Sequence, residues 1–386
     1  MNTISISRRR FAQLLGAGAA AAVARPALSL GAPPEVSPAA ASPGIAGAVV
    51  RLSSNENPYG PSPKALKAMT DAFGLACRYP DEHADLLIAA LAKSEGVNAD
   101  QILLGAGSGE ILKISASAFT GPAASGKNGT AGRGKLVVAD PTFEAIIKHA
   151  SLRGAETVKV PLDARFGHDL PKMAAAAKEG LIYLCNPNNP TASLTPKNEI
   201  REFIKKTPRQ TAILVDEAYH HYVDSPDYES VIPLIKDHPN LIVARTFSKI
   251  YGMAGMRCGF CIAQRATIER MRPHQLWDSV SIMGLVAAIA SLNDPDQVAN
   301  GRRLNSEARA FVIGELDKLG YEQIPSHANF IMFNVKRPVV PLIQALKQRN
   351  VHVGRLFPAL PNHMRLTIGK KTEMETFLTA FRQVTA

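Results

Sequence analysis

Residues 211–219 read TAILVDEAY, and this stretch shows the pattern that decides the fold: a short apolar run that ends in a carboxylate and a phenol. Three other runs have the same form, namely KLVVAD (135–140), LIYLCNP (181–187) and LIVARTF (241–247). Short apolar runs that end in polar or turn residues are typical of strands buried on both faces. Helical patterns lie between them, as in EILKISASAF. This alternation predicts an α/β fold with a mostly parallel sheet covered by helices.

The pattern changes after about residue 275. Residues 285–320 predict a long helical stretch, and ANFIMFNV (328–335) and MRLTIG (364–369) predict strands, followed by a closing helix. This order predicts a second, smaller α+β domain. Residues 49–61 are expected to pack with it.

The N-terminal segment has the features of an export signal. Residues 5–29 read SISRRRFAQLLGAGAAAAVARPALS, with an arginine cluster, a short apolar stretch and small residues suited to cleavage. Ser7-Arg8-Arg9-Arg10-Phe11 resembles the twin-arginine signature, so we expect contact with the twin-arginine translocase and a periplasmic mature protein. The apolar stretch is too short for a stable membrane anchor. A disordered basic tail is the alternative.

Together these patterns divide the chain into five segments. They are a twin-arginine signal peptide at 1–29, a flexible linker at 30–48, an N-terminal segment packing with the small domain at 49–78, a large sheet domain at 79–275 and a small C-terminal domain at 276–386. The linker is rich in Pro, Ala and Ser, as flexible connections often are.

The sequence argues against two other classes of function, nucleic-acid binding and metal or redox chemistry. The formal net charge is +11, but four of these charges lie in residues 1–29 and no concentrated basic patch follows, which argues against nucleic-acid binding. Cys258 and Cys261 have CxxC spacing, yet RCGFCIA (257–263) has a strand pattern that points them to opposite faces, so we expect core cysteines. Adjacent His220 and His221 diverge in the same way, and no metal site is predicted.

Side chains that follow the strands form a candidate site, because the carboxyl ends of parallel strands meet at one edge of a sheet. Asp216 ends an apolar strand and needs a cationic partner if it is buried. Tyr219 offers a phenol, Asn189 an amide and Phe143 a flat aromatic face. Lys249 offers an amine that becomes nucleophilic when it is desolvated near other cations. Each residue alone is compatible with a structural role.

A second group of residues could bind an anion. GAGSGE (105–110) opens a predicted helix, whose first N–H groups are free to bind an anion around Ser108 and Gly109. Ser248 adds a hydroxyl, and Arg257 adds a guanidinium that can grip a phosphate. A flat ring with a phosphate, a basic nitrogen, a phenolic oxygen and an aldehyde would satisfy both groups. These features describe pyridoxal 5′-phosphate, with Lys249 forming the Schiff base.

The motifs also carry a family resemblance that spans about residues 49–386. The sequence resembles histidinol-phosphate aminotransferases and their fold-type-I relatives in the motifs NENPYG, RYP, GAGSGEIL, DPTF, CNPNNPTA, VDEAY, RTFSKIYGMAGMRCGF, HANFIMF and MRLTIG, which occur in the same order. The resemblance implies the fold of the pyridoxal-phosphate-dependent transferases of fold type I. In that fold a large domain with a seven-stranded, mostly parallel sheet is joined to a smaller α+β domain.

The resemblance further implies roles for the residues around the cofactor ring. Lys249 would be the Schiff-base lysine and the proton carrier between the substrate Cα and the cofactor. Asp216 would pair with the ring nitrogen, Asn189 and Tyr219 would hold the 3′-oxygen, and Phe143 would stack on the ring.

The phosphate group has its own implied partners, which come from both subunits of a homodimer. Ser108, Gly109, Ser248 and Arg257 would hold the phosphate within one subunit. Tyr79 would reach the phosphate of the neighbouring subunit's cofactor.

The implied reaction is transamination between an amino donor and a 2-oxo acid acceptor. Arg365 matches the arginine that binds the substrate α-carboxylate, and Arg355 and Tyr59 are further substrate candidates. The glycine of the NPTG motif is replaced by Ala192, and the loop between Arg355 and Arg365 is short, so the donor and acceptor stay open. Two alternatives remain: a decarboxylase, lyase or racemase of the same fold, and an exported binding protein without chemistry.

Overall fold

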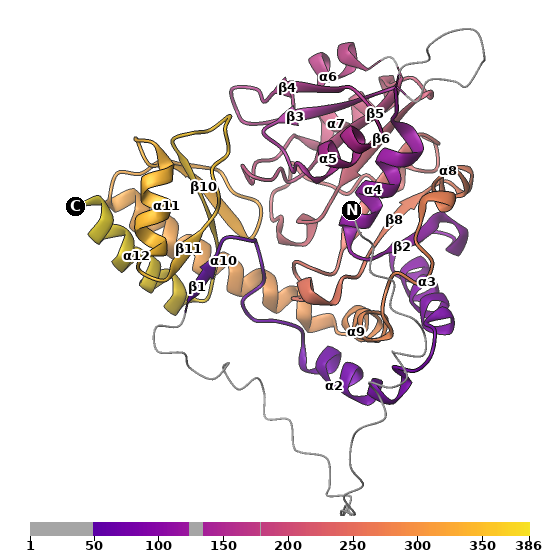
Figure 1. Cartoon of the computed structure of the whole chain (residues 1–386), viewed down its shortest axis with the longest axis horizontal. Coiled ribbons are helices and arrows are strands. Elements are labelled where there is room, and N and C mark those ends of the chain that lie inside the picture. Colours follow the sequence, from indigo (N-terminus) through magenta and orange to yellow (C-terminus); the bar gives the residue numbers. More distant parts are fainter. Residues whose placement is uncertain (1–48, 123–133, 178) are drawn as a thin grey trace, which may run out of the picture. The chain divides into compact units, whose positions relative to one another are not determined.

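The structure, a computed structural model, describes residues 49–122, 134–177 and 179–386 (Figure 1). The proposed signal peptide at 1–29 and linker at 30–48 lie outside these residues. Within the described part of the chain, no helix is both long and apolar enough to cross a bilayer.

A seven-stranded sheet forms the larger part of the fold, as predicted. Its order is β2-β8-β7-β6-β5-β3-β4, and β8 alone runs antiparallel to its neighbours. The four apolar runs that predicted the sheet are β3, β5, β6 and β7. The strands are β2 (Ile102–Gly105), β3 (Lys135–Asp140), β4 (Thr157–Pro161), β5 (Gly180–Cys185), β6 (Thr211–Asp216), β7 (Leu241–Thr246) and β8 (Gly259–Ala263).

Helices bury both faces of this sheet, which explains why its strands are apolar throughout. One face packs against α4 (Ser108–Phe119), α5 (Ala145–Leu152) and α8 (Arg265–Met271). The other face packs against α2 (Pro63–Asp71), α3 (Asp81–Glu95), α6 (Leu170–Ala176), α7 (Lys197–Lys206) and α9 (Ile282–Leu292). Cys258 and Cys261 are buried free thiols in these two separate cores, so the expectation of core cysteines is confirmed.

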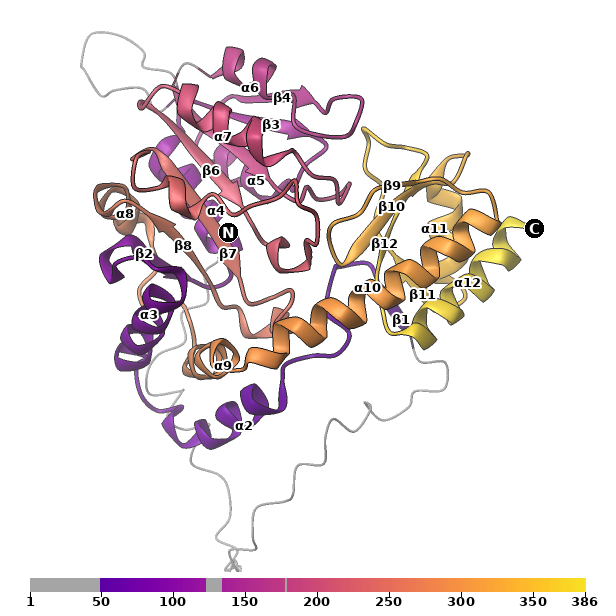
Figure 2. The ribbon, with the colours of Figure 1, turned by 180° about the vertical axis from the view of Figure 1, so that it is seen from behind.

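A third apolar core belongs to the C-terminal part of the chain. Its three-stranded antiparallel sheet has the order β12-β10-β9, and β1 pairs in parallel with β11. The elements are β1 (Val50–Leu52), α10 (Pro295–Lys318), β9 (Gln323–Ile324), β10 (Phe330–Asn334), α11 (Val339–Lys347), β11 (Val351–Val353), β12 (His363–Thr367) and α12 (Lys371–Thr385). Figure 2 shows α10 running between α9 and this group of elements.

The long helical stretch predicted at 285–320 is divided into two helices. Asp294 takes an extended conformation at the N-cap and Pro295 begins α10, because proline fits the first turn of a helix but not its interior. α9 lies before this break and packs into the core of the large sheet together with α2. The proposed domain boundaries at 78/79 and 275/276 stay predictions.

Short 3₁₀ helices complete the described part of the fold. They lie at Phe73–Leu75, Ala99–Gln101, His220–Tyr222, Ile232–Leu234, Ala254–Met256 and Arg272–His274.

Candidate active site

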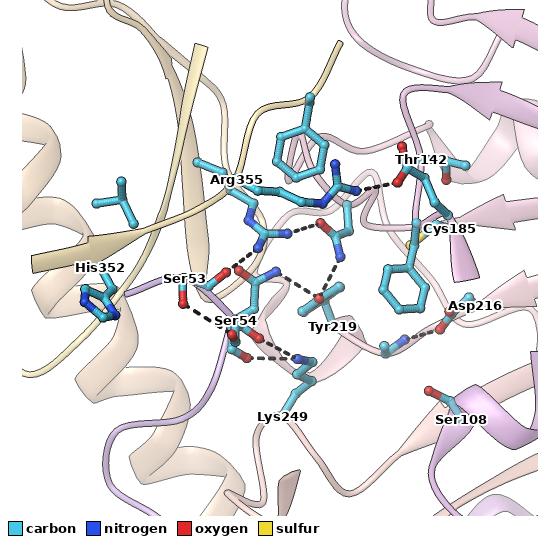
Figure 3. Close-up of a pocket in the computed structure, with 18 of the residues that line it drawn as sticks. Ser53, Ser54, Ser108, Thr142, Cys185, Asp216, Tyr219, Lys249, His352 and Arg355 are labelled. Carbon is cyan, nitrogen blue, oxygen red and sulfur yellow. Dashed lines mark hydrogen bonds and ion pairs between the residues drawn. The ribbon is translucent and has the colours of Figure 1, made fainter. Parts of the chain in front are cut away.

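A cavity of about 650 Å³ lies at the carboxyl ends of the parallel strands, where functional residues were expected (Figure 3). Residues from β12 and the segment after β11 close its other side. Eight of the predicted site residues line it: Ser108, Phe143, Asn189, Asp216, Tyr219, Lys249, Arg355 and Arg365. Side chains far apart in sequence therefore meet in one space.

Asp216 occupies the last position of β6 and is 3% exposed. Burial raises the pKa of its carboxyl to about 6, and two hydrogen bonds oppose that rise. The Tyr183 hydroxyl donates to Asp216 Oδ2 at 2.9 Å, and the Ala218 N–H donates to Oδ1 at 3.1 Å. Asp216 is therefore an ionisable carboxylate that is held in one orientation.

The Lys249 amine lies across the cavity from Asp216. Its Nζ donates to the backbone carbonyls of Asn55 at 3.0 Å and Ser54 at 3.4 Å. Burial, and next the positive charge of Arg365, lower its pKa to about 8. The neutral, nucleophilic form of this amine is therefore far more populated near neutral pH than that of an exposed lysine.

A hydrogen-bonded chain joins the phenol of Tyr219 to Arg365. The Tyr219 hydroxyl accepts from Asn55 Nδ2 at 3.1 Å and from Asn189 Nδ2 at 3.4 Å. Arg365 Nη1 donates to Asn189 Oδ1 at 2.7 Å, and its Nη2 donates to the Ser53 carbonyl at 2.5 Å. Burial lowers the pKa of Arg365 to about 10 and raises that of Tyr219. Asn189 therefore links a phenol to a buried cation.

The start of α4 lies against Arg257, and we name these residues the anion cradle because they are the ones proposed from the sequence to bind an anion. Gly107 has φ +76°, a conformation that favours glycine, and a Cβ there would lie 2.3 Å from Arg257 Nη2 and displace that guanidinium. Arg257 Nη1 also donates to Ser248 Oγ at 3.4 Å. No side chain caps the start of α4, whose N–H groups around Ser108 and Gly109 can bind an anion. These donors fit a phosphate group.

Another part of the cavity wall combines an aromatic face with an ion pair. Phe143 follows β3 and is 39% exposed, so its ring is available for stacking. The next residue, Glu144, accepts from Arg355 Nη2 at 2.5 Å. The Arg355 guanidinium lies 4.4 Å from the ring centroid of Phe357. An aromatic face, a buried acid, an amine and a phosphate cradle together fit pyridoxal phosphate.

Five predicted residues do not line the cavity in this chain. Gly109, Ser248 and Arg257 lie beside it in the anion cradle. Tyr59 is 41% exposed, and Lys370 Nζ lies 5.9 Å from the centroid of its ring. Tyr79 is 81% exposed. The roles proposed for Tyr59 and Tyr79 stay predictions, and that of Tyr79 requires a second subunit.

Several cavity residues were not predicted from the sequence. They include Ser53, Ser54, Asn55, Thr142, Glu144, Cys185, His352 and Phe357. Asn55 lies in the NENPYG motif, and this motif was the available signal. Ala192, at the glycine position of NPTG, adopts φ +61° and leaves Asn189 in place.

The expectation that His220 and His221 diverge is wrong, because their rings lie against each other at an interplanar angle of 42°. Their ring centroids lie 3.7 Å apart, and His221 Nε2 contacts the Tyr251 hydroxyl at 3.3 Å. Burial lowers the pKa of both imidazoles. No cluster of potential metal ligands occurs among the residues that the structure describes.

Comparison with known proteins identifies the family. The family described as aminotransferase class I and II matches residues 48–381. The chain is 35% identical over 343 residues to the histidinol-phosphate aminotransferase of Moorella thermoacetica, covering 88% of this chain and 86% of that protein. It is 37% identical over 338 residues to histidinol-phosphate aminotransferase 1 of Dechloromonas aromatica, covering 87% and 90% of the two chains.

A solved structure agrees with this assignment. The histidinol-phosphate aminotransferase of Sinorhizobium meliloti in complex with pyridoxal-5′-phosphate has a TM-score of 0.79 and 26% identity, over 88% of this chain and 91% of that one. By its sequence, its fold and the arrangement of its cavity, the chain belongs to the class I and II aminotransferases.

Proposed function

We propose that the chain transfers an amino group between an anionic amino acid or amine and a 2-oxo acid, with pyridoxal 5′-phosphate as its cofactor. One observation carries the proposal: a buried amine of lowered pKa, Lys249, and a buried ionisable carboxylate, Asp216, face the same cavity. The phenol of Tyr219 lies beside the amine, with Lys249 Nζ 5.6 Å from its ring centroid.

Bound pyridoxal phosphate supplies an aldehyde and an electron-accepting ring. The residues of this chain hold that group and move protons around it. The Lys249 amine would hold the aldehyde carbon and, once a donor amine replaces it, would move the proton from the donor Cα. The Asp216 carboxylate would keep the ring nitrogen protonated, and the cradle at Arg257 would hold the phosphate.

Two arginines set the charge of the substrate. Arg365 is nearly buried, and its Nε has no hydrogen-bond partner among the described residues. Arg355 lies on the neighbouring segment after β11 and pairs with Glu144. A carboxylate or phosphate would satisfy these guanidinium groups, since charged and bidentate bonds are the strong ones. Histidinol phosphate, which names the curated relatives, is therefore the first donor to test.

The same fold supports decarboxylases and other lyases, so the reaction must be tested directly. The visible spectrum of the purified, cofactor-loaded protein should change when a true donor is added, and a 2-oxo acid should restore it. A spectral change on adding the donor that a 2-oxo acid does not reverse would favour a lyase. No response to any donor, with the cofactor bound, would favour an inactive binding protein.

A homodimer is also proposed, because large apolar side chains are exposed around the segment that contains Tyr79. Tyr79, Leu86, Leu276 and Trp277 are 81%, 59%, 55% and 91% exposed. A crevice lined by residues 80–88 and 272–280 joins these segments. A second copy of the chain that covers this surface would carry Tyr79 toward the neighbouring site.

We further propose that the protein is exported to the periplasm. The arginine cluster at Arg8, Arg9 and Arg10 supports this, together with the short apolar stretch that follows. Replacement of Arg8 and Arg9 by lysine should leave the protein in the cytoplasmic fraction of cells. Unchanged fractionation of this variant would contradict the proposal.

A further inference from the structure

Tyr183 is a buried phenol with no part in the chemistry described above. It lies in the fourth position of β5, with 0% of its surface exposed, between the aliphatic residues Ile182 and Leu184. A phenol in such a core is costly unless its hydroxyl is hydrogen-bonded. Its hydroxyl donates to Asp216 Oδ2 at 2.9 Å. The one polar group of this side chain is therefore committed to a carboxylate of the active site.

The sheet fixes this contact. β5 and β6 are parallel neighbours in which Tyr183 pairs with Leu214 and Cys185 pairs with Asp216. Tyr183 and Asp216 thus lie two residues apart in register and on the same face, because side chains alternate along a strand. The phenol is long enough to bridge that interval. Both residues belong to the rigid centre of the sheet and not to a loop.

The two oxygens of Asp216 are held by different groups. Oδ2 accepts from the Tyr183 hydroxyl, and Oδ1 accepts from the Ala218 N–H at 3.1 Å. The backbone donor alone would allow the carboxylate plane to tilt about that bond. The second donor, which comes from a neighbouring strand, fixes the orientation of the plane.

We propose that Tyr183 is a positioning residue that acts through Asp216 on the ring nitrogen of the cofactor. It aims the carboxylate and favours its ionised form, which is the form that can hold a protonated ring nitrogen. This inference rests on the proposed function, since it requires pyridoxal phosphate in the cavity.

The electrostatic surroundings of Asp216 agree with this role. Burial raises the pKa of Asp216, the Tyr183 hydrogen bond and the Ala218 N–H lower it, Lys249 also lowers it, and Glu217 raises it. Burial keeps the nearby Cys185 thiol neutral by raising its pKa. Among these groups Tyr183 is the side chain whose hydrogen bond can be removed without a change of charge.

The test compares cofactor binding by Tyr183→Phe and by a matched control, Tyr251→Phe. Tyr251 is also a buried tyrosine, but its hydroxyl contacts His221 and does not line the cavity. Equilibrium dialysis would measure the affinity of each protein for pyridoxal phosphate and for its deaza analogue, in which carbon replaces the ring nitrogen. Thermal unfolding of the cofactor-free proteins would report on folding.

We expect Tyr183→Phe to bind pyridoxal phosphate about tenfold more weakly, as for the loss of one hydrogen bond to a charged group. Its affinity for the deaza analogue should equal that of the wild type, and Tyr251→Phe should match the wild type with both ligands. The effect of Tyr183→Phe should also disappear in an Asp216→Asn background.

Equal weakening with both ligands would overturn the inference, because a structural role alone would then explain it. Unchanged affinity for pyridoxal phosphate would overturn it as well. If Tyr183→Phe is unfolded at the assay temperature, the comparison is repeated with both variants below their unfolding temperature. A wild-type protein that binds no pyridoxal phosphate contradicts the proposed function instead, so the two failures are distinguishable.

Discussion

Among single residues, Lys249 and Asp216 have pKa values shifted in opposite directions. The pKa of Lys249 is lowered and that of Asp216 is raised, and burial is the largest cause of both shifts. Burial disfavours the charged form, so the amine loses its proton more easily and the carboxyl retains its proton to a higher pH. Each group then depends on a partner inside the cavity. The cofactor offers both partners, an aldehyde for the amine and a ring nitrogen for the carboxylate.

The lowered pKa of Lys249 predicts the pH dependence of cofactor capture. The rate at which cofactor-free protein reacts with pyridoxal phosphate should rise with pH and be half-maximal near pH 8, because only the neutral amine attacks. A simple lysine derivative, followed by the same absorbance change, provides the profile of an unperturbed amine. Arg365→Met should move the midpoint upward, since it removes a nearby cation. A wild-type midpoint shared with the simple amine would contradict this account.

The raised pKa of Asp216 predicts that Asp216→Asn stabilises the cofactor-free protein. The folded-state pKa of about 6, above the ordinary value of 3.8, means that the folded state favours the protonated form and loses stability as the pH rises from 3.8 through about 6. This difference between the folded and the ordinary pKa of Asp216 corresponds to about 3 kcal/mol of unfolding free energy at pH 8.

Urea unfolding of the cofactor-free wild type and Asp216→Asn would measure this difference. The gain of the variant should be complete above about pH 6 and shrink as the pH falls toward 3.8. The same variant should lose transamination, because an amide cannot keep the ring nitrogen protonated. A variant that is less stable than the wild type at pH 8 would show that Asp216 carries no burial cost.

The sequence predicts the site residues whose chemistry is uncommon in a core, such as Lys249 and Asp216 at strand ends. It does not predict Tyr183 or Asn55, for physical reasons. A phenol in an aliphatic strand is compatible with any buried acceptor, and the register of β5 against β6 decides which acceptor it reaches. Asn55 reaches the site from a segment 164 residues away from Tyr219, a contact that only the fold creates.

At the scale of elements, a buried ion-pair network supports the strand ends below the site. Arg245 on β7 donates to Glu217 Oε2 at 3.0 and 2.8 Å, and to Glu95 at the end of α3 at 2.8 Å. The Val231 N–H donates to the other oxygen of Glu217 at 2.8 Å. Since Glu217 directly follows Asp216, the network fixes the backbone that carries the Asp216 carboxylate.

Glu217→Ala should therefore destabilise the protein by about 3–5 kcal/mol, because it leaves the Arg245 charge buried with fewer partners. Chemical denaturation would measure the loss. Glu269→Ala is the matched control, since Glu269 pairs with Arg265 at 2.8 Å on the exposed surface of α8. Its stability should equal that of the wild type. Equal losses in the two variants would contradict a special role for the network.

The sequence patterns predict some element boundaries and miss others. The strands β3, β5, β6 and β7 agree with the patterns that predicted them. Each strand is buried on both faces of the sheet, so its sequence is a short run of apolar residues that is easy to recognise. The break between α9 and α10 was not predicted, although Asp294 and Pro295 form an N-cap and first turn. Helical periodicity continues across such a break, and tertiary packing decides that α9 joins the core of the large sheet.

At the scale of the whole molecule, the exposed apolar surface around Trp277 predicts assembly. Trp277→Ser should weaken the proposed homodimer and shift it toward monomer in analytical ultracentrifugation, because a large apolar contact is lost. Leu152→Ser is the control, since Leu152 is 75% exposed on α5 and lies outside that surface. A wild-type protein that is monomeric at all concentrations would contradict the prediction.

The large sheet and the C-terminal part of the fold, each with its own core, supply different residues to the cavity. The large sheet supplies Asp216, Lys249 and the anion cradle, whereas β12 supplies Arg365. The hydrogen bond between Arg365 and Asn189 joins the two groups. The cofactor and the substrate carboxylate are therefore assigned to different parts of the chain, which meet at the cavity.

The most direct test of amino transfer follows labelled nitrogen from donor to acceptor. The cofactor-loaded protein is mixed with a donor whose amino nitrogen is isotopically labelled, first histidinol phosphate, and with 2-oxoglutarate. Mass spectrometry then measures the label in glutamate. We predict that label appears in glutamate in equal amount to the donor consumed, and that Lys249→Ala abolishes the transfer. Consumption of donors with release of carbon dioxide, and no label in glutamate, would contradict the aminotransferase account.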